Sequence, residues 1–128
     1  MAGFSTTLRT NRSEEINSLI GAGGKLLLMN GTRPATGGAL TTTLATIIMN
    51  GTQFGTVTNG VLTADAIADG AGAGDDTATW ARITNSANAF VMDLSIGTSG
   101  TEVIISTTTI STGLVIPVTS IVITEANA

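Results

Sequence analysis

The sequence has 128 residues, a formal net charge of −4 and a pI near 4.4, and it contains neither cysteine nor histidine. It therefore cannot form disulfides, thiolate metal sites or a Ser-His-Asp triad, and its acidity argues against a nucleic-acid partner. Only 11% of the residues are charged, against about 25% in ordinary soluble domains, so we expect a non-enzymatic protein with no catalytic residue, no metal and no cofactor.

The first predicted element is a short helix near the N-terminus. Three apolar residues recur at helical spacing and form one narrow stripe: Ile16, Leu19 and Ile20. Thr10 or Ser13 can cap the start of this helix, and the glycines from residue 21 onward end it. A start near Phe4 would add Leu8 to the same face. Because the stripe is thin, we expect the helix to pack against the rest of the chain.

After the helix, short apolar runs alternate with turn residues. Asn-Gly dipeptides at residues 30–31, 50–51 and 59–60 are strong turn signals, because both residue types tolerate positive φ. The predicted strands are residues 25–29, 43–49, 54–58, 61–67, 77–84, 89–96, 102–106, 111–116 and 118–125. In the segment 89–96, strict alternation places Phe90 on the face of Leu94 and opposite Asp93.

Short strands at intervals of roughly ten residues are typical of an all-β domain. We predict a β-sandwich or jelly-roll-like antiparallel domain of about eight strands with a short N-terminal helix. Residues 1–24 would form an N-terminal arm and helix, and residues 25–128 the β-sandwich domain. The N-terminal quarter of the chain is mildly basic, because it contains Arg9, Arg12, Lys25 and Arg33 against two glutamates. This excess is consistent either with a basic segment seated on an acidic partner surface or with ordinary scatter of few charges.

Two glycine-rich segments lack the spacing of ligand-binding loops. Residues 19–25 have Leu19 where a phosphate-binding loop needs glycine, so they are interpreted as the end of the helix. Residues 69–76 contain three aspartates, which could hold calcium, but their spacing is not that of a calcium loop. A solvated hinge loop is the favoured interpretation.

No membrane segment is predicted. The uncharged stretch 103–124 is interrupted by threonine, serine, glycine and proline, whereas a transmembrane helix needs about 20 predominantly apolar residues. The first eleven residues are polar, unlike those of a secretory signal peptide.

Trp80 and Arg82 alternate with small residues, so they are expected to share one strand face. They could form an interface hot spot, because Trp and Arg dominate such spots. In the favoured alternative, Trp80 is a core residue with Arg82 at its rim.

Five stretches resemble a family of small virion structural proteins from tailed bacteriophages and prophages. They are FSTTLR at 4–9, GTRPATGG at 31–38, ATWAR at 78–82, MDLSIGTSG at 92–100 and TSIVITE at 119–125. Together they span nearly the whole chain in order, and they include no catalytic motif.

The resemblance implies a capsid decoration (cement) protein that is made in the host bacterial cytoplasm and lies on the outer capsid surface of the virion. Its implied partners are the major capsid protein and further copies of itself, a trimer being favoured over a dimer. A host- or glycan-binding module of a phage tail or head fibre is the alternative. The residues expected at a capsid or oligomer interface are Phe4, Leu8, Arg9, Arg12, Arg33, Trp80 and Arg82.

Overall fold

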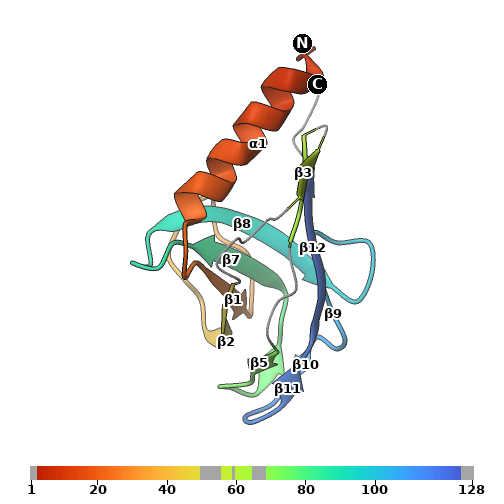
Figure 1. The fold of residues 1–128 in the computed structure, drawn as a ribbon. Helices are drawn as coiled ribbons and strands as arrows, with labels where there is room; N and C mark the ends of the chain where they lie inside the picture. The colour runs from red at the N-terminus through yellow and green to blue at the C-terminus, as the bar shows by residue number, and fades with distance from the viewer. Residues whose placement is uncertain (1–2, 50–55, 59, 65–68, 125–128) are drawn as a thin grey trace.

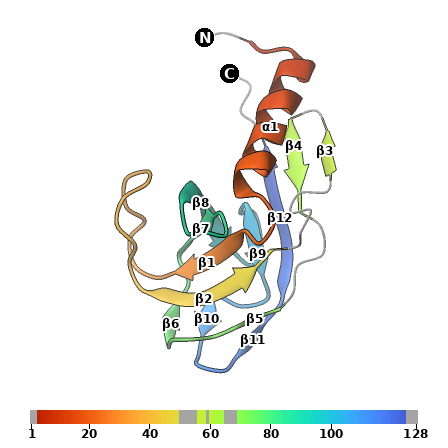
Figure 2. The same ribbon diagram turned by 60° about the vertical axis from the view of Figure 1, so that its left-hand side comes forward.

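The computed structural model describes residues 3–49, 56–58, 60–64 and 69–124. Over these ranges the protein is mostly strand with one helix, and the predicted all-β, sandwich-like fold is confirmed (Figure 1, Figure 2). The elements are α1 (Thr6–Ile20), β1 (Lys25–Met29), β2 (Thr43–Ile48), β3 (Thr56–Thr58), β4 (Val61–Thr63), β5 (Gly70–Ala71), β6 (Asp76–Thr77), β7 (Trp80–Thr84), β8 (Phe90–Gly97), β9 (Val103–Ile105), β10 (Thr109–Ile110), β11 (Val115–Ile116) and β12 (Val118–Thr124).

Some predicted features fall on residues that are not described. They are the turn at 50–51, Asn59, the start of the predicted strand 54–58, and the ends of the predicted strands 61–67 and 118–125. The turn chemistry is seen at the other glycines of the Asn-Gly pairs, since Gly31 and Gly60 both have positive φ, 71° and 78°. Gly31, however, opens a long connection between β1 and β2 and not a tight hairpin.

Eight strands form one large sheet in the order β2-β1-β7-β8-β9-β12-β4-β3. Its neighbouring strands pair in the predicted antiparallel sense, except that β8 and β9 are parallel. The parallel pairing covers only Ile96 with Val103 and Gly97 with Ile104. Residues 98–102 connect β8 directly to β9, which is much shorter than the crossover of about a dozen residues that usually joins parallel strands.

One buried cluster joins the two halves of the sheet. The half made of β2, β1, β7 and β8 contributes residues that include Leu28, Ile47, Ile83 and Leu94, and the half beyond β8 contributes residues that include Leu62, Val103, Ile105, Ile121 and Ile123. Each fully buried aliphatic side chain contributes about 1.5–3 kcal/mol. The sheet therefore wraps around this main core, which gives the sandwich its two layers. Leu27, Met29 and Trp80 form a second, smaller buried cluster.

The helix begins earlier than its expected caps. Ser5 is the N-cap, and its hydroxyl accepts a hydrogen bond from the N–H of Leu8 at 3.1 Å. Thr10 and Ser13, the expected caps, lie inside α1 and bond instead to Gly60, at the turn between β3 and β4. The helix ends where predicted, with Gly21 at φ 64° as its C-cap.

The helix packs on the sandwich through one side. Ile20 is 1% exposed and belongs to the main core, and Ile16 packs against that core. The Thr10 hydroxyl accepts the Gly60 N–H at 3.2 Å, while the Ser13 hydroxyl donates to the Gly60 carbonyl at 3.3 Å. Figure 2 shows α1 beside the β3–β4 hairpin. Most of the predicted arm is therefore attached to the β domain by both apolar and polar contacts.

A bulge changes the faces of β8. Ile83 pairs with Met92 but Thr84 pairs with Phe90, so the register shifts by one residue at Val91. A bulge of this kind reverses the faces of the residues beyond it. Phe90 therefore lies on the face of Asp93, and the predicted placement of Phe90 with Leu94 was wrong.

Two short two-stranded sheets, β10 with β6 and β11 with β5, complete the described fold. The glycine- and aspartate-rich segment 69–76 thus includes β5 and the start of β6. Asp75 accepts hydrogen bonds from the Thr112 N–H at 2.7 Å and the Thr112 hydroxyl at 3.2 Å. Among the described residues, no three side chains of the metal-binding types gather into a site. In the same part of the chain no helix is long and apolar enough to cross a membrane.

Candidate interaction surface

The structure divides the predicted interface residues into two groups. The first lies on the outer face of β7 and in the loop over it: Arg33, Trp80 and Arg82. The second lies on α1 and just before it: Phe4, Leu8, Arg9 and Arg12. Residues 30–42, which connect β1 to β2, are called the covering loop below. Figure 2 shows the covering loop and the first turn of α1 in different parts of the molecule.

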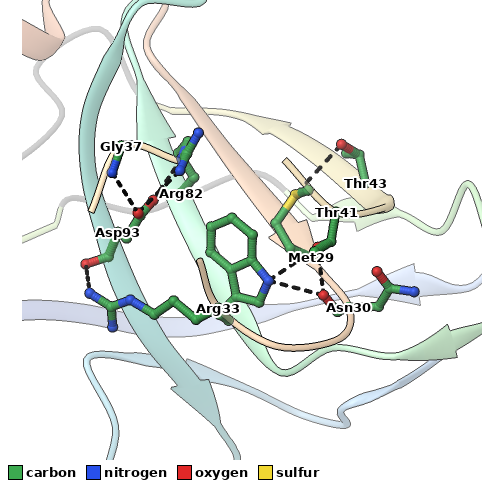
Figure 3. Close-up of polar contacts among 9 residues, drawn as sticks. Met29, Asn30, Arg33, Gly37, Thr41, Thr43, Arg82 and Asp93 are labelled. Atoms are coloured by element: carbon green, nitrogen blue, oxygen red, sulfur yellow. Dashed lines mark hydrogen bonds and ion pairs between the residues drawn. The ribbon is translucent and has the colours of Figure 1, made fainter. Parts of the chain in front are cut away.

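The centre of the first group is a buried ion pair. The Arg82 Nε lies 2.6 Å from Asp93 Oδ1, and a second guanidinium nitrogen donates to Asp93 Oδ2 at 3.1 Å (Figure 3). The two residues face each other across β7 and β8. Both are buried, so water screens the pair little. This fork geometry is that of the stronger Arg–carboxylate pairs.

Two aromatic rings flank the same guanidinium. The Arg82 Cζ lies 5.3 Å from the centroid of the Trp80 ring and 4.9 Å from that of the Phe90 ring. Both distances are within the range of cation–π attraction. Phe90 reaches this position because of the bulge in β8. We call Trp80, Arg82, Phe90 and Asp93 the arginine cluster.

Trp80 holds the base of the covering loop. The indole is 1% exposed and packs with Leu27 and Met29. Its N–H donates to the carbonyl of Asn30 at 3.0 Å and to the hydroxyl of Thr41 at 3.2 Å, one residue from each end of the loop. Trp80 is thus a core residue, as the favoured interpretation states, while Arg82 is more deeply buried than a rim position implies.

Asn30 also links the base of the covering loop to β6. Its side-chain amide donates to Asp76 Oδ2 at 2.8 Å, and its side-chain oxygen accepts the Thr42 N–H at 2.9 Å. The hydrogen bond from Asn30, together with that from the Thr77 N–H, lowers the pKa of Asp76 below its ordinary value. These two hydrogen bonds therefore favour the ionised form of Asp76, which accepts both of them.

Asp93 holds the far part of the covering loop. Arg33 donates from its guanidinium to the Asp93 carbonyl at 2.9 Å, and the Gly37 N–H donates to Asp93 Oδ2 at 3.4 Å (Figure 3). Gly37 has φ 75°, and a Cβ at this position would lie 3.5 Å from the Phe90 ring. The loop is therefore fixed both at its ends and in its middle.

The outer side of the covering loop is exposed to solvent. Its exposed side chains include Thr32, Arg33, Ala35, Thr36, Leu40 and Thr42. Leu40 is 48% exposed and is the large apolar residue among them. The loop offers hydroxyls, methyl groups and one guanidinium, which suit contact with another protein. Trp80 and Arg82 are buried, so their side chains are not part of this exposed surface.

In the second group, Arg12 lies over the ring of Phe4. The Arg12 Cζ lies 4.9 Å from the centroid of the Phe4 ring. Leu8 is 44% exposed, Arg12 is also exposed, and Arg9 is half-buried. The structure thus presents a second exposed surface, on α1, that mixes apolar and basic side chains.

The sequence analysis missed three residues that organise the first group: Asn30, Phe90 and Asp93. A signal for Asp93 was present, because a single charge inside the otherwise uncharged segment 89–96 needs a partner when it is buried. Phe90 gave no such signal, since the bulge cannot be inferred from the alternation. The chain matches no family model, no curated protein and no solved structure.

Proposed function

We propose that this protein is a virion structural protein of a tailed phage, a capsid decoration (cement) protein that binds the outside of the head shell and bridges capsid subunits. The observation that supports this best is the covering loop, which contains the stretch 31–38 of the phage-like resemblance. Two members of the arginine cluster, Trp80 and Asp93, fix this loop while its outer side chains remain exposed.

A loop that is fixed before binding suits a static structural contact. Ordering a mobile segment on binding opposes association, and a loop already held in one conformation avoids much of that loss. A protein that binds only the assembled shell stabilises it by mass action. Binding alone is then the whole mechanism, and no chemical step is needed.

At least seven of the twelve charged side chains in the described ranges form hydrogen bonds within the protein, which supports attachment without many ion pairs. These side chains include those of Lys25, Arg33, Asp75, Asp76, Arg82, Asp93 and Glu102. The shell contact would then depend on apolar burial and on uncharged hydrogen-bonding groups such as threonine hydroxyls.

The same proposal includes the partners and the location. The partners are the major capsid protein and further copies of this chain, and the location is the outer surface of the head after synthesis in the host bacterial cytoplasm. Within the described residues, the exposed aromatic Phe90 has an arginine over its ring. A ring covered in this way is a poor platform for stacking a sugar, which favours the capsid role over a glycan-binding fibre module.

The test uses undecorated heads of the phage or prophage whose genome encodes this chain. Purified protein is mixed with the heads, the heads are pelleted, and their thermal release of DNA is followed with a dye. We expect the protein to pellet with the heads and to raise the release temperature. Leu40→Glu should abolish pelleting, whereas Val115→Glu, at a position that is 60% exposed on β11, should not.

Two results would overturn the proposal. If folded wild-type protein stays in the supernatant, or binds isolated tails or fibres in place of heads, the protein is not a decoration protein. If Leu40→Glu and Val115→Glu pellet equally well, the covering loop is not the shell contact.

A further inference from the structure

Helix α1 carries a seam of exposed residues on the side adjacent to its packed side. Successive spacings of four, three and four connect its members: Leu8, Arg12, Glu15 and Leu19. All four are exposed, and the two leucines are 44% and 58% exposed. The packed positions, including Ser13, Ile16 and Ile20, belong to a different stripe of the helix.

The spacing of this seam is that of a coiled-coil interface. Alternating steps of four and three residues keep side chains on one stripe of a helix and allow a second helix to pack along it. In heptad terms Leu8 and Glu15 are d positions, and Arg12 and Leu19 are a positions. The ends of the seam are apolar and its centre is charged.

The four seam residues are complementary to the same four residues of a second helix that runs in the opposite direction. In an antiparallel pair of identical helices, Leu8 faces Leu19 of the second copy and Arg12 faces Glu15 of the second copy, because both pairings share one midpoint between residues 13 and 14. A two-fold axis at that midpoint generates two leucine contacts and two opposite-charge contacts. A parallel pairing would set like charges against each other at both central positions.

We propose that α1 is a self-association surface, on which a second copy of this chain packs its own α1 in antiparallel orientation. The charge order selects that occupant, since the helix complements itself. Figure 1 shows α1 as a separate layer at one end of the sandwich. This association requires only α1, so it holds whether or not the protein binds a capsid.

Disulfide trapping tests the pairing directly, because the natural sequence has no cysteine. The variants Leu8→Cys and Leu19→Cys are oxidised separately and as a mixture. In the antiparallel pair the two copies of position 8 lie about 16 Å apart along the helix, since 11 residues at 1.5 Å each separate positions 8 and 19. A disulfide needs Cα atoms within about 7 Å, so we expect the mixture to form a covalent dimer and the single variants not to.

Ser18→Cys is the control for random collision, because Ser18 is exposed on α1 outside the seam. A dimer of Leu8→Cys with itself that forms as fast as the mixed dimer would overturn the antiparallel arrangement. If Ser18→Cys forms a mixed disulfide dimer with Leu8→Cys as readily as Leu19→Cys does, the interface is not specific.

Charge reversal provides a second test without cysteines. Glu15→Arg places arginine against arginine and should weaken the dimer at least tenfold in light-scattering titrations. The double variant Arg12→Glu, Glu15→Arg restores opposite charges and should recover dimerisation, with circular dichroism confirming that α1 stays folded. A wild-type protein that remains monomeric up to millimolar concentration, or that forms trimers insensitive to both reversals, would overturn the proposal.

Discussion

The Arg82 guanidinium and the Asp93 carboxylate form a two-point ion pair across β7 and β8, beneath the covering loop. The same aspartate accepts the Gly37 N–H through its side chain and the Arg33 guanidinium through its carbonyl. One residue of the sheet thus fixes both a neighbouring strand and the loop above it. The exposed surface that we assign to the capsid contact depends on this buried pair.

Removing the charge of Asp93 should destabilise the whole fold. Asp93→Asn keeps the shape of the side chain but leaves the Arg82 guanidinium buried without its counter-charge, which typically costs about 3–5 kcal/mol. We expect the midpoint of urea unfolding to fall accordingly. Asp69→Asn changes an exposed aspartate in the same way and should alter the free energy of unfolding by no more than about 0.5 kcal/mol.

A double replacement separates the effect of the unpaired charge from that of lost packing. Arg82→Met with Asp93→Leu removes both charges, and such apolar replacements of a buried pair are often close to neutral. The double variant should therefore be more stable than Asp93→Asn alone. Equal stability of Asp93→Asn and Asp69→Asn would show that the pair does not stabilise the fold.

The fold was predictable where local patterns decide the structure. The segment 25–29 and the glycine end of the helix match the structure because an apolar run and a helix-ending glycine act locally. The start of the helix was not predictable from its stripe, since three polar residues, Ser5, Thr10 and Ser13, are all suited to a cap. Only the contact with Gly60 shows that Thr10 and Ser13 have another role.

Neighbouring positions on α1 should differ sharply in their effect on stability. Ile20 is 1% exposed within the main core, whereas Leu19 is 58% exposed. Ile20→Ala leaves a cavity and should lower the free energy of unfolding by about 2–5 kcal/mol. Leu19→Ala should change it by less than about 0.5 kcal/mol, measured on dilute protein so that self-association does not contribute.

Equal losses for Ile20→Ala and Leu19→Ala would mean that α1 does not dock as the structure shows. A small loss at Ile20 would further mean that residues 1–24 behave as an independent arm. The buried state of Ile20 and Ser13 leads us to expect the opposite.

The candidate interaction surface was predictable only in part, for topological reasons. Arg33, Trp80 and Arg82 were all expected at an interface, and the structure brings them together at the covering loop. Their connection through Asp93 depends on which strands are neighbours, and the position of Phe90 depends on a one-residue bulge. Neither is encoded in the alternation of a single strand. The residue types at this site could be predicted from the sequence, but the contacts that bring them together could not.

Attachment to heads should change little with salt. The charged residues of the arginine cluster are buried and paired, and other charged side chains bond within the protein. Exposed ion pairs contribute only about 0–1 kcal/mol each, and near 0.5 M NaCl the Debye length is well below roughly 10 Å. If the covering loop binds through Leu40 and uncharged groups, decorated heads pelleted across a NaCl series should retain the protein. Mild urea should release it, because urea solvates apolar and peptide groups.

In the competing arrangement the N-terminal basic residues Arg9 and Arg12 hold an acidic patch of the shell, and most of the protein would leave the pellet by about 0.5 M NaCl. Such a release, seen equally in Leu40→Glu and wild-type protein, would transfer the shell contact from the covering loop to α1.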